Sequence, residues 1–455
     1  MLSQAREEDS SEGSLPTVNG VECDNAQASE LQPWQRYLVL FIVSWNCLVV
    51  TSASTSLLVA TPEIAATLHT TPEILNATNS GVLLAMGFSS LFWSPLSDIV
   101  GRRVSYNASL VVLFTSSIGT AVAPQMSVFT AMRILSGFTG TWFMVAGQTI
   151  IADLFPPLVR GRAVGCQMVG TVAGTALGPS IGGIIITYDN WRWIYWLQTC
   201  QAALGLVLSF LYIPSIASRV RQATEGGKDA PQHLGQLFNP IRVFRLFLKS
   251  QILLADLACG FLAVTQYALL SSVRHIINPR FNLTTPLISG LFYLSPGIGF
   301  MVGSLAGGRL SDHMVKRWIA KRDGLRLPKD RLNSGIVHLF FILPASSLLY
   351  GWGLHYDFGG IPLAIIMAFW IGIGLMGAWN GLNTYTGEVI PDRRSDVVCS
   401  KYVLQYVFAA SATGMIVPMI DAIGVGWSFT ICAFLHLAGG IIVVYVARYA
   451  PDKVA

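Results

Sequence analysis

The chain has 455 residues, of which 53% are hydrophobic and only 12% are charged, and its formal net charge is +5. Soluble domains carry about 25% charged residues, so this composition excludes an ordinary soluble protein and indicates one embedded in a lipid bilayer. The cations lie in short loops between apolar stretches, which is a signal of membrane orientation and not of nucleic-acid binding. The seven cysteines are scattered, without a C-x-x-C pair or a histidine cluster, so we expect no disulfide framework and no metal site.

Residues 1–33 are polar and acidic and contain no apolar core behind a basic segment, so they predict a disordered cytosolic tail and not a signal peptide. About twelve apolar stretches follow, and each approaches the roughly 20 residues that a helix needs to cross a bilayer. They lie near residues 36–60, 80–97, 104–123, 127–152, 160–186, 191–213, 249–277, 285–310, 335–353, 361–389, 396–420 and 426–448. The sequence therefore predicts an all-α polytopic membrane protein with twelve transmembrane helices.

The longest polar interval between these stretches divides the chain into two six-helix, pseudo-symmetric halves. The first half is expected over residues 34–213 and the second over residues 249–449. The basic segment 214–248 is the cytosolic linker between them, and it is too short for a further domain. Residues 450–455 form a short cytosolic tail.

The positions of Lys and Arg predict how the chain is oriented in the membrane. If the N-terminus lies in the cytosol, almost all cations fall in or beside cytosolic segments, as the positive-inside rule requires. The exceptions are Arg133, Arg192, Arg274 and Arg280. Two glycosylation sequons, at Asn76 and Asn282, then fall on the outer side, where a glycan can be added. We expect a plasma-membrane glycoprotein with both termini in the cytosol.

Two similar polar loops each follow an apolar stretch, one in each half. The first runs from Ser94 to Arg103, and the second follows the stretch 285–310. An Asp near a helix end and cations on the next helix can pair in one conformation and separate in another, so we interpret both loops as gating loops. The alternative is that these charges only anchor the topology. The gating residues are Asp98, Gly101, Arg102, Arg103, Asp312, Lys316 and Arg317.

The stretch 160–186 contains glycines about one helical turn apart, and the stretch 285–310 repeats this pattern at Gly299, Gly303 and Gly307. Glycines one turn apart let a neighbouring backbone approach closely. We expect these faces to form the surface on which the two halves rock, although generic small-residue packing would leave the same pattern. The interface residues predicted on the first stretch are Gly174, Gly178, Pro179, Gly182 and Gly183.

Arg133 is the most informative charge, because it lies several residues inside the stretch 127–152. A charge within the membrane is costly and normally faces a cavity or a partner. The first half offers no carboxylate at mid-depth, and Asp256, Glu388 and Asp421 of the second half lie toward helix ends. An arginine without a nearby carboxylate suits an anionic substrate. The alternative is a structural role for Arg133.

Neutral polar side chains recur inside the apolar stretches and are candidates for substrate binding, because amides and phenols can donate hydrogen bonds to carboxylate oxygens. For each of them a hydrogen bond between helices is an equally good explanation. Arg274, near the outer end of its stretch, is a candidate anion site or an interfacial cation, and Lys401 is expected to be a cytosolic-side anchor. The neutral candidates are Asn46, Gln148, Gln167, Gln266, Tyr267, Asn380, Asn383, Tyr385, Gln405 and Tyr406.

Several of these patterns resemble those of the major facilitator superfamily. The loop from Ser94 to Arg103 is similar to the loop between that family's second and third helices, with Ser94 in place of the usual Gly. The run from Arg133 to Gly137 resembles its fourth-helix R-x-x-x-G pattern. The glycines that follow Gly165 fit G-x8-G-x3-G-P-x2-G-G, which resembles the motif of the drug/proton antiporter branch. The resemblance implies a cytoplasmic latch at the loops, a central cavity and export of the substrate.

Other runs, such as Gly137 to Thr141 and Val417 to Trp427, look like those of fungal itaconate exporters, and this similarity covers residues 34–449. We therefore expect a secondary transporter that exports a small dicarboxylate by alternating access, with itaconate as the substrate that the resemblance favours. Its partners would be this anion and the lipid bilayer. Export needs no protons, because moving a dianion out of a negative-inside cell releases about 4.6 kcal/mol per 100 mV, at about 2.3 per charge.

Two alternatives stay open. The first is a broad drug or secondary-metabolite/proton antiporter, which would add protons as a partner. The second is a transport-inactive nutrient sensor of the same fold. An enzyme is not expected, since neither a G-x-x-x-x-G-K-[ST] loop nor an H-E-x-x-H motif is present, and we expect no cofactor.

Overall fold

The computed structural model describes residues 32–155, 159–213, 241–281, 286–323, 325, 327–390 and 393–449. Most of the predicted tails and linker, and the sequon at Asn282, lie outside these ranges. Every element within the described ranges is a helix, as the sequence predicts.

The first half contains six predicted spans. The first is divided at Ser56 into two helices, and the fourth is divided in the same way at Phe138 and Thr139. The helices are α2 (Pro33–Thr55), α3 (Leu57–Thr67), α4 (Pro72–Val100), α5 (Arg102–Ala121), α6 (Met126–Gly137), α7 (Gly140–Leu154), α8 (Arg160–Tyr188) and α9 (Arg192–Tyr212).

The second half repeats this plan after two short helices, α12 (Ile241–Phe244) and η1 (Arg245–Leu248). Its eighth and ninth spans are again assembled from shorter pieces. The elements are α13 (Ser250–Arg280), α14 (Pro286–Phe292), α15 (Leu294–Lys321), η2 (Pro328–Ser334), η3 (His338–Ile342), α16 (Leu343–His355), α17 (Gly360–Glu388) and α18 (Arg394–Tyr449).

Ten helical segments within the described residues are long and apolar enough to cross a membrane. One of them, α18, joins the last two predicted spans across Gly424, where the backbone leaves the helical region with φ 83° and ψ 164°. The predicted span 104–123 is α5, whose Ser and Thr residues make it less apolar than the others. The described helices therefore account for the twelve predicted spans.

Gly101 separates α4 from α5 within the first gating loop. Its φ of 92° lies in a region that side-chain-bearing residues rarely adopt, so glycine is required at this sharp turn. The structure thus gives a physical reason for the glycine in the loop motif.

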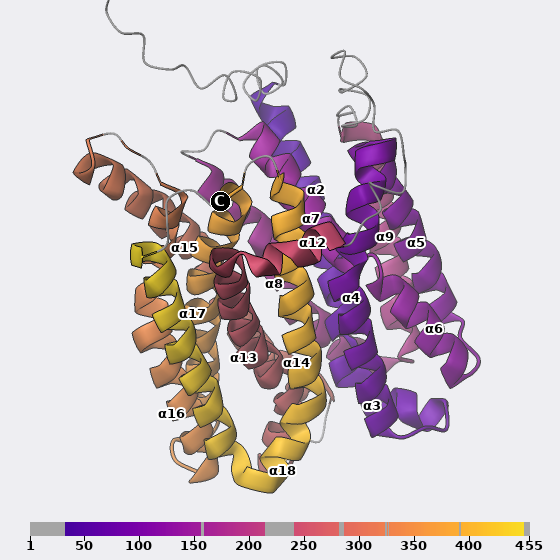
Figure 1. The fold of residues 1–455 in the computed structure, drawn as a ribbon. Helices are drawn as coiled ribbons and strands as arrows, with labels where there is room; N and C mark the ends of the chain where they lie inside the picture. The colour runs from indigo at the N-terminus through magenta and orange to yellow at the C-terminus, as the bar shows by residue number, and fades with distance from the viewer. Residues whose placement is uncertain are drawn as a thin grey trace, which may run out of the picture.

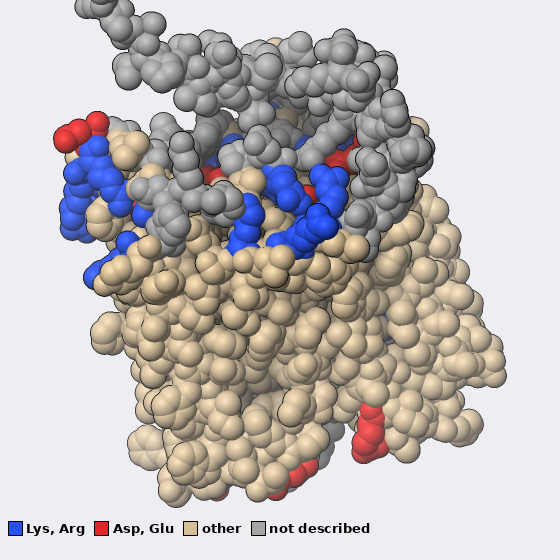
Figure 2. Space-filling model, in the orientation of Figure 1, with Lys and Arg blue, Asp and Glu red and all other residues tan. Residues whose placement is uncertain are grey.

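The two halves lie side by side, with their helices running between the same two ends of the molecule (Figure 1). Across the boundary between the halves, α8 packs against α14 and α15, and α4 packs against α18. Lys and Arg gather at one end, while the middle of the face shown has almost no charged side chains on its surface (Figure 2). We call this the charged end. It includes the turn at Gly101, the start of α8 and the last residues of α15.

At the opposite end, two contacts tie α13 to other parts of the second half. Arg280 hydrogen-bonds to Asp357, which lies before α17, and this bond lowers the pKa of the exposed Asp357 carboxyl. His275 Nε2 lies 2.8 Å from Asp421 Oδ1 on α18. The sequon residue Asn76 also lies toward this end, but within α4 and half-buried instead of in a loop.

Candidate functional site: a cavity between the halves

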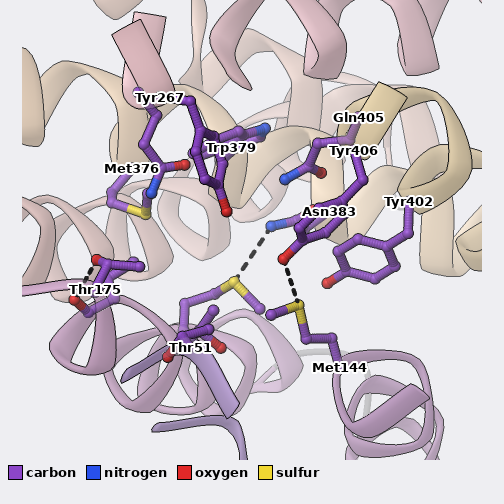
Figure 3. Close-up of a pocket in the computed structure, with 14 residues that line it drawn as sticks. Thr51, Met144, Thr175, Tyr267, Met376, Trp379, Asn383, Tyr402, Gln405 and Tyr406 are labelled. Carbon is purple, nitrogen blue, oxygen red and sulfur yellow. Dashed lines mark hydrogen bonds between the residues drawn. The ribbon is translucent and has the colours of Figure 1, made fainter. Parts of the chain in front are cut away.

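A small cavity lies between the two halves, deep within the bundle. Its walls come from α2, α7 and α8 of the first half and from α13, α17 and α18 of the second (Figure 3). The cavity has a volume of about 40 Å³, which is enough for a few water molecules only. The lining residues are Thr51, Met144, Met168, Thr171, Val172, Thr175, Gln266, Tyr267, Met376, Trp379, Asn383, Tyr402, Gln405 and Tyr406.

Five of the residues predicted to bind substrate are brought together in this lining. They are Gln266, Tyr267, Asn383, Gln405 and Tyr406. All five come from the second half, and the first half contributes threonines, thioethers and one valine. The lining therefore offers amide, phenol and hydroxyl groups that can donate hydrogen bonds, and none of the described residues that form it is Asp or Glu.

The other neutral candidates do not line this cavity, and all but Tyr385 make hydrogen bonds between or within helices. Asn46 donates to the Tyr106 hydroxyl at 3.1 Å, and Gln167 donates to the Met144 carbonyl at 3.3 Å. Asn380 donates to the carbonyl of Ser304 at 3.0 Å. These three residues therefore make the hydrogen bonds between helices that the sequence left open as an alternative to substrate binding. Tyr385 is buried on α17 without lining the cavity, and the side chain of Arg274 lies outside the described residues.

Gln148 is different, because its hydrogen bond crosses from one half to the other. Its Nε2 donates to the hydroxyl of Tyr402 at 2.9 Å, and Tyr402 lines the cavity. The side chains of Tyr406 and Met144 also meet across the halves, at 3.7 Å between Oη and Sδ (Figure 3). Separation of the halves must break both contacts, so any movement of one half away from the other changes the cavity wall.

Arg133 lies within the first half and is absent from the cavity lining. Its side chain is fully buried, and Nη1 donates to the carbonyl of Ala53 at 2.6 Å, close to the break between α2 and α3. The guanidinium carbon lies 5.7 Å from the centre of the Tyr195 ring. In this conformation Arg133 contacts the first transmembrane segment at its break and does not line the cavity.

We therefore expect Arg133→Ala to lower stability while leaving the affinity of correctly folded molecules for substrate unchanged. The variant loses a buried hydrogen bond from a charged donor, which contributes about 1.5–3 kcal/mol. Thermal unfolding and saturation of transport would measure the two effects. Arg192→Ala is a control, because Arg192 also donates to a carbonyl, that of Ala123, but is less buried. Normal stability with a raised KM would instead assign Arg133 to the substrate.

Sequence reasoning missed Lys401, and its expected role as a cytosolic-side anchor is wrong. The side chain is 0% exposed, and Nζ donates to Asn383 Oδ1 at 2.8 Å. It also lies 3.8 Å from the centre of the Tyr402 ring. The sequence does contain a signal that Lys401 lies near the candidate binding residues. Lys401 and Gln405 are four residues apart and so share one face of a helix.

An ionic cluster joins the halves at the charged end, and it includes Asp312 of the second gating loop. Asp312 Oδ2 accepts a hydrogen bond from the backbone N–H of Arg162 on α8 at 3.1 Å. Arg331 of η2 lies 3.1 Å from both Asp312 and Glu388, and Arg160 of α8 lies 3.8 Å from Glu388. Because α8 belongs to the first half, these contacts span the boundary.

The other predicted gating residues are not part of this cluster. Lys316 and Arg317 are exposed on α15, while Asp98 and Arg102 are half-buried around the turn at Gly101. Arg103 lies against Phe210 of α9, in its own half. The contact between halves near this first loop is made by Ser94 and Ser395, whose hydroxyls are 2.6 Å apart. The sequence did not predict this contact between serines, nor the roles of Arg160 and Arg331 in the cluster.

The predicted interface glycines divide between two faces of α8. A Cβ added at Gly174 would meet Thr51 Oγ1 at 2.0 Å, and one added at Gly178 would meet the Ser52 carbonyl at 2.8 Å. Both neighbours belong to α2, so the expectation that these glycines face the other half is wrong. Gly182 likewise faces residues of its own half, namely Ser56 and Ile194.

Two of the predicted interface residues do lie between the halves. A Cβ at Gly183 would meet the Pro286 carbonyl at 2.6 Å, and one at Gly290 would meet the Pro179 carbonyl at 3.0 Å. The repeated glycines of the second half again face inward, toward α17. For example, a Cβ at Gly303 would meet the carbonyl of Ile373 at 2.6 Å. Close glycine packing therefore occurs both within each half and between α8 and the second half, where a Cβ added at Gly297 would meet the Ala176 Cβ at 2.0 Å.

Two helical halves with a cavity between them are the arrangement expected of a secondary transporter. The family model of the Major Facilitator Superfamily matches residues 43–411, which is most of the chain. The protein therefore belongs to the major facilitator superfamily.

Known proteins similar to this chain are fungal transporters at low identity. The MFS-type transporter phiD of Fungal sp. is 24% identical over 85% of this chain, which spans 64% of phiD's length. The MFS antiporter QDR3 of Candida albicans is 21% identical, with 91% of this chain and 78% of QDR3 covered. Among solved structures, the human organic anion transporter MFSD10 matches with a TM-score of 0.70 at 16% identity. That match covers 91% of this chain and 100% of the other, and it shows the shared fold.

Proposed function

We propose that this protein exports a small dicarboxylate, with itaconate as the candidate substrate, by alternating access across the plasma membrane with both termini in the cytosol. The observation that carries the proposal is the composition of the cavity. Its polar lining consists of amides, phenols and hydroxyls without a carboxylate. Such groups can donate to carboxylate oxygens, and no acidic residue of the lining would repel an anion.

A second candidate is a drug or secondary-metabolite/proton antiporter. Thioethers and aromatic rings, including Met144, Met168, Met376 and Trp379, make up a large part of the cavity wall. Such surfaces adapt to varied apolar ligands. QDR3, one of the similar proteins, is named an antiporter. The two candidates differ in the substrate's charge and in the driving force, so one assay separates them.

We expect itaconate flux in proteoliposomes to follow an imposed potassium-diffusion potential and to persist when the pH is equal on both sides. An itaconate dianion that leaves alone carries two charges, so each 100 mV changes the driving free energy by about 4.6 kcal/mol. Counterflow with labelled itaconate would measure this flux, with liposomes lacking protein as the control. Flux that ignores the potential but follows an opposing proton gradient would favour the antiporter. Transport of aromatic compounds without any of itaconate would exclude the dicarboxylate.

A further inference from the structure

Lys401 is a buried cation that the cavity lining conceals. It lies seven residues after the start of α18, or about 10 Å along the helix axis, and is 0% exposed. Its ammonium makes one direct hydrogen bond, to Asn383, and no carboxylate oxygen lies within 4.0 Å among the described residues. A buried ammonium without a direct ion pair is costly, which points to a role beyond packing.

Two side chains that line the cavity contact this cation. Asn383 lines the cavity and accepts the hydrogen bond of Lys401 through Oδ1, while its Nδ2 contacts the sulfur of Met168 on the other half at 3.4 Å. Tyr402, whose ring covers the ammonium, lines the cavity too and is held by Gln148 of the first half. Both screening side chains are therefore held by contacts that break when the halves separate.

A buried carboxyl group lies beside Ser400, the residue before Lys401. Asp256 of α13 is 0% exposed and accepts a hydrogen bond from Ser400 at 2.9 Å. Its Oδ1 has no hydrogen-bond partner within the described part of the chain. Asp256 interacts with Lys401 electrostatically without touching it. The other titratable groups near this pair are Cys259, Tyr385, Cys399 and Tyr402.

We infer that Lys401 is the cation that binds the carboxylate of the substrate, and that Asp256 balances its charge while the cavity is empty. This inference rests on the proposed export of an organic anion. When the halves separate on one side, Asn383 and Tyr402 lose their partners across the boundary, and the ammonium can exchange the Asn383 oxygen for a substrate carboxylate. No bond is made or broken covalently in this exchange.

The first test compares the transport of carboxylates by Lys401→Met, Lys401→Arg and wild type in proteoliposomes. Loss of a charged hydrogen bond predicts a fall in kcat/KM of about 10- to 100-fold for Lys401→Met. Lys401→Arg keeps the positive charge and should retain part of the kcat/KM that Lys401→Met loses. Lys321→Met removes an exposed cation from the end of α15 and should match wild type. Wild-type transport by Lys401→Met would overturn the inference.

A double variant shows whether a loss of transport reflects misfolding. Lys401→Met alone leaves Asp256 without its counter-charge, whereas Asp256→Asn together with Lys401→Met removes both charges at nearly constant volume. We expect the double variant to unfold at the wild-type temperature and to be as poor a carboxylate transporter as Lys401→Met. Recovery of transport in the double variant would show that Lys401 only neutralises Asp256, and would overturn the inference.

Accessibility separates the failure of this inference from the failure of the proposed function. In a background without other reactive cysteines, Lys401→Cys should react with an anionic, membrane-impermeant methanethiosulfonate, and itaconate should slow the reaction. Ala409→Cys, equally buried on the same helix, should not react. If wild type transports no dicarboxylate, the proposed function fails. Labelling at position 401 that other organic anions block would then still support an anion site, and absent labelling would overturn it.

Discussion

Replacing Arg331 with Met is expected to destabilise the protein by about 3–5 kcal/mol and to open the charged end of the bundle. Arg331 is 1% exposed and contacts the carboxylates of Asp312 and Glu388, so its removal leaves two buried anions close together. Arg160 lies 3.8 Å from Glu388 and can compensate only in part. Because the cluster joins α8 to the second half, its loss should favour the conformation that is open at this end.

Two measurements would check this result. Thermal unfolding reports the loss of stability, and spin labels at the exposed positions Val104 and Ala320, one in each half, report the opening as a longer distance. Arg393→Met is the matched control. Arg393 pairs with Asp396 at 3.0 Å within a single half, and both side chains are partly exposed, so its loss should cost about 0.3–0.5 kcal/mol. An unchanged label distance in Arg331→Met would show that the cluster does not hold the halves together.

Hydropathy was sufficient to predict the spans, because a bilayer demands long apolar helices whatever their neighbours are. The predicted stretch 361–389 corresponds to α17 at Gly360–Glu388, and 104–123 to α5 at Arg102–Ala121. The largest error at the start of a span is at α4, which begins at Pro72 and not near residue 80. Its first turns contain Glu73 and several polar residues, so they are helical without being apolar. The breaks within spans depend on tertiary packing, which hydropathy does not report.

The candidate site was harder to predict, because helical spacing shows which residues share a face but not what that face meets. Gly174 and Gly178 do share a face of α8, yet that face meets α2 of the same half. Arg133 was a reasonable choice as a rare intramembrane charge, but its side chain is directed to Ala53. Lys401 was overlooked because it is close in sequence to the cations of the charged end. Only the packing of α18 against α13 and α17 shows that it is buried.

Substitutions at two glycines of α8, five residues apart, are expected to have different consequences because their neighbours belong to different halves. At Gly178 an added side chain meets the backbone of Ser52 within 3.0 Å, inside the first half. Overpacking of this kind costs about 1–3 kcal/mol or more, so Gly178→Leu should reduce the yield of folded protein. At Gly183 the added side chain meets Pro286 across the boundary, where the halves can separate to relieve the clash.

Gly183→Leu should therefore fold, yet it should transport at least about 10-fold more slowly, because the wedge prevents closure at the end opposite the charged end. Size-exclusion chromatography and thermal unfolding would report folding, and proteoliposome flux would report turnover. Cysteine labels at that end should react faster in Gly183→Leu than in wild type, since a bulky side chain there favours the open conformation. Gly183→Ala adds only a methyl group, so its transport rate should lie between those of wild type and Gly183→Leu. If Gly183→Leu instead unfolds as readily as Gly178→Leu, the contact between α8 and α14 does not separate during transport. The rocking surface must then lie at other contacts between the halves, such as those of α8 with α15 and of α4 with α18.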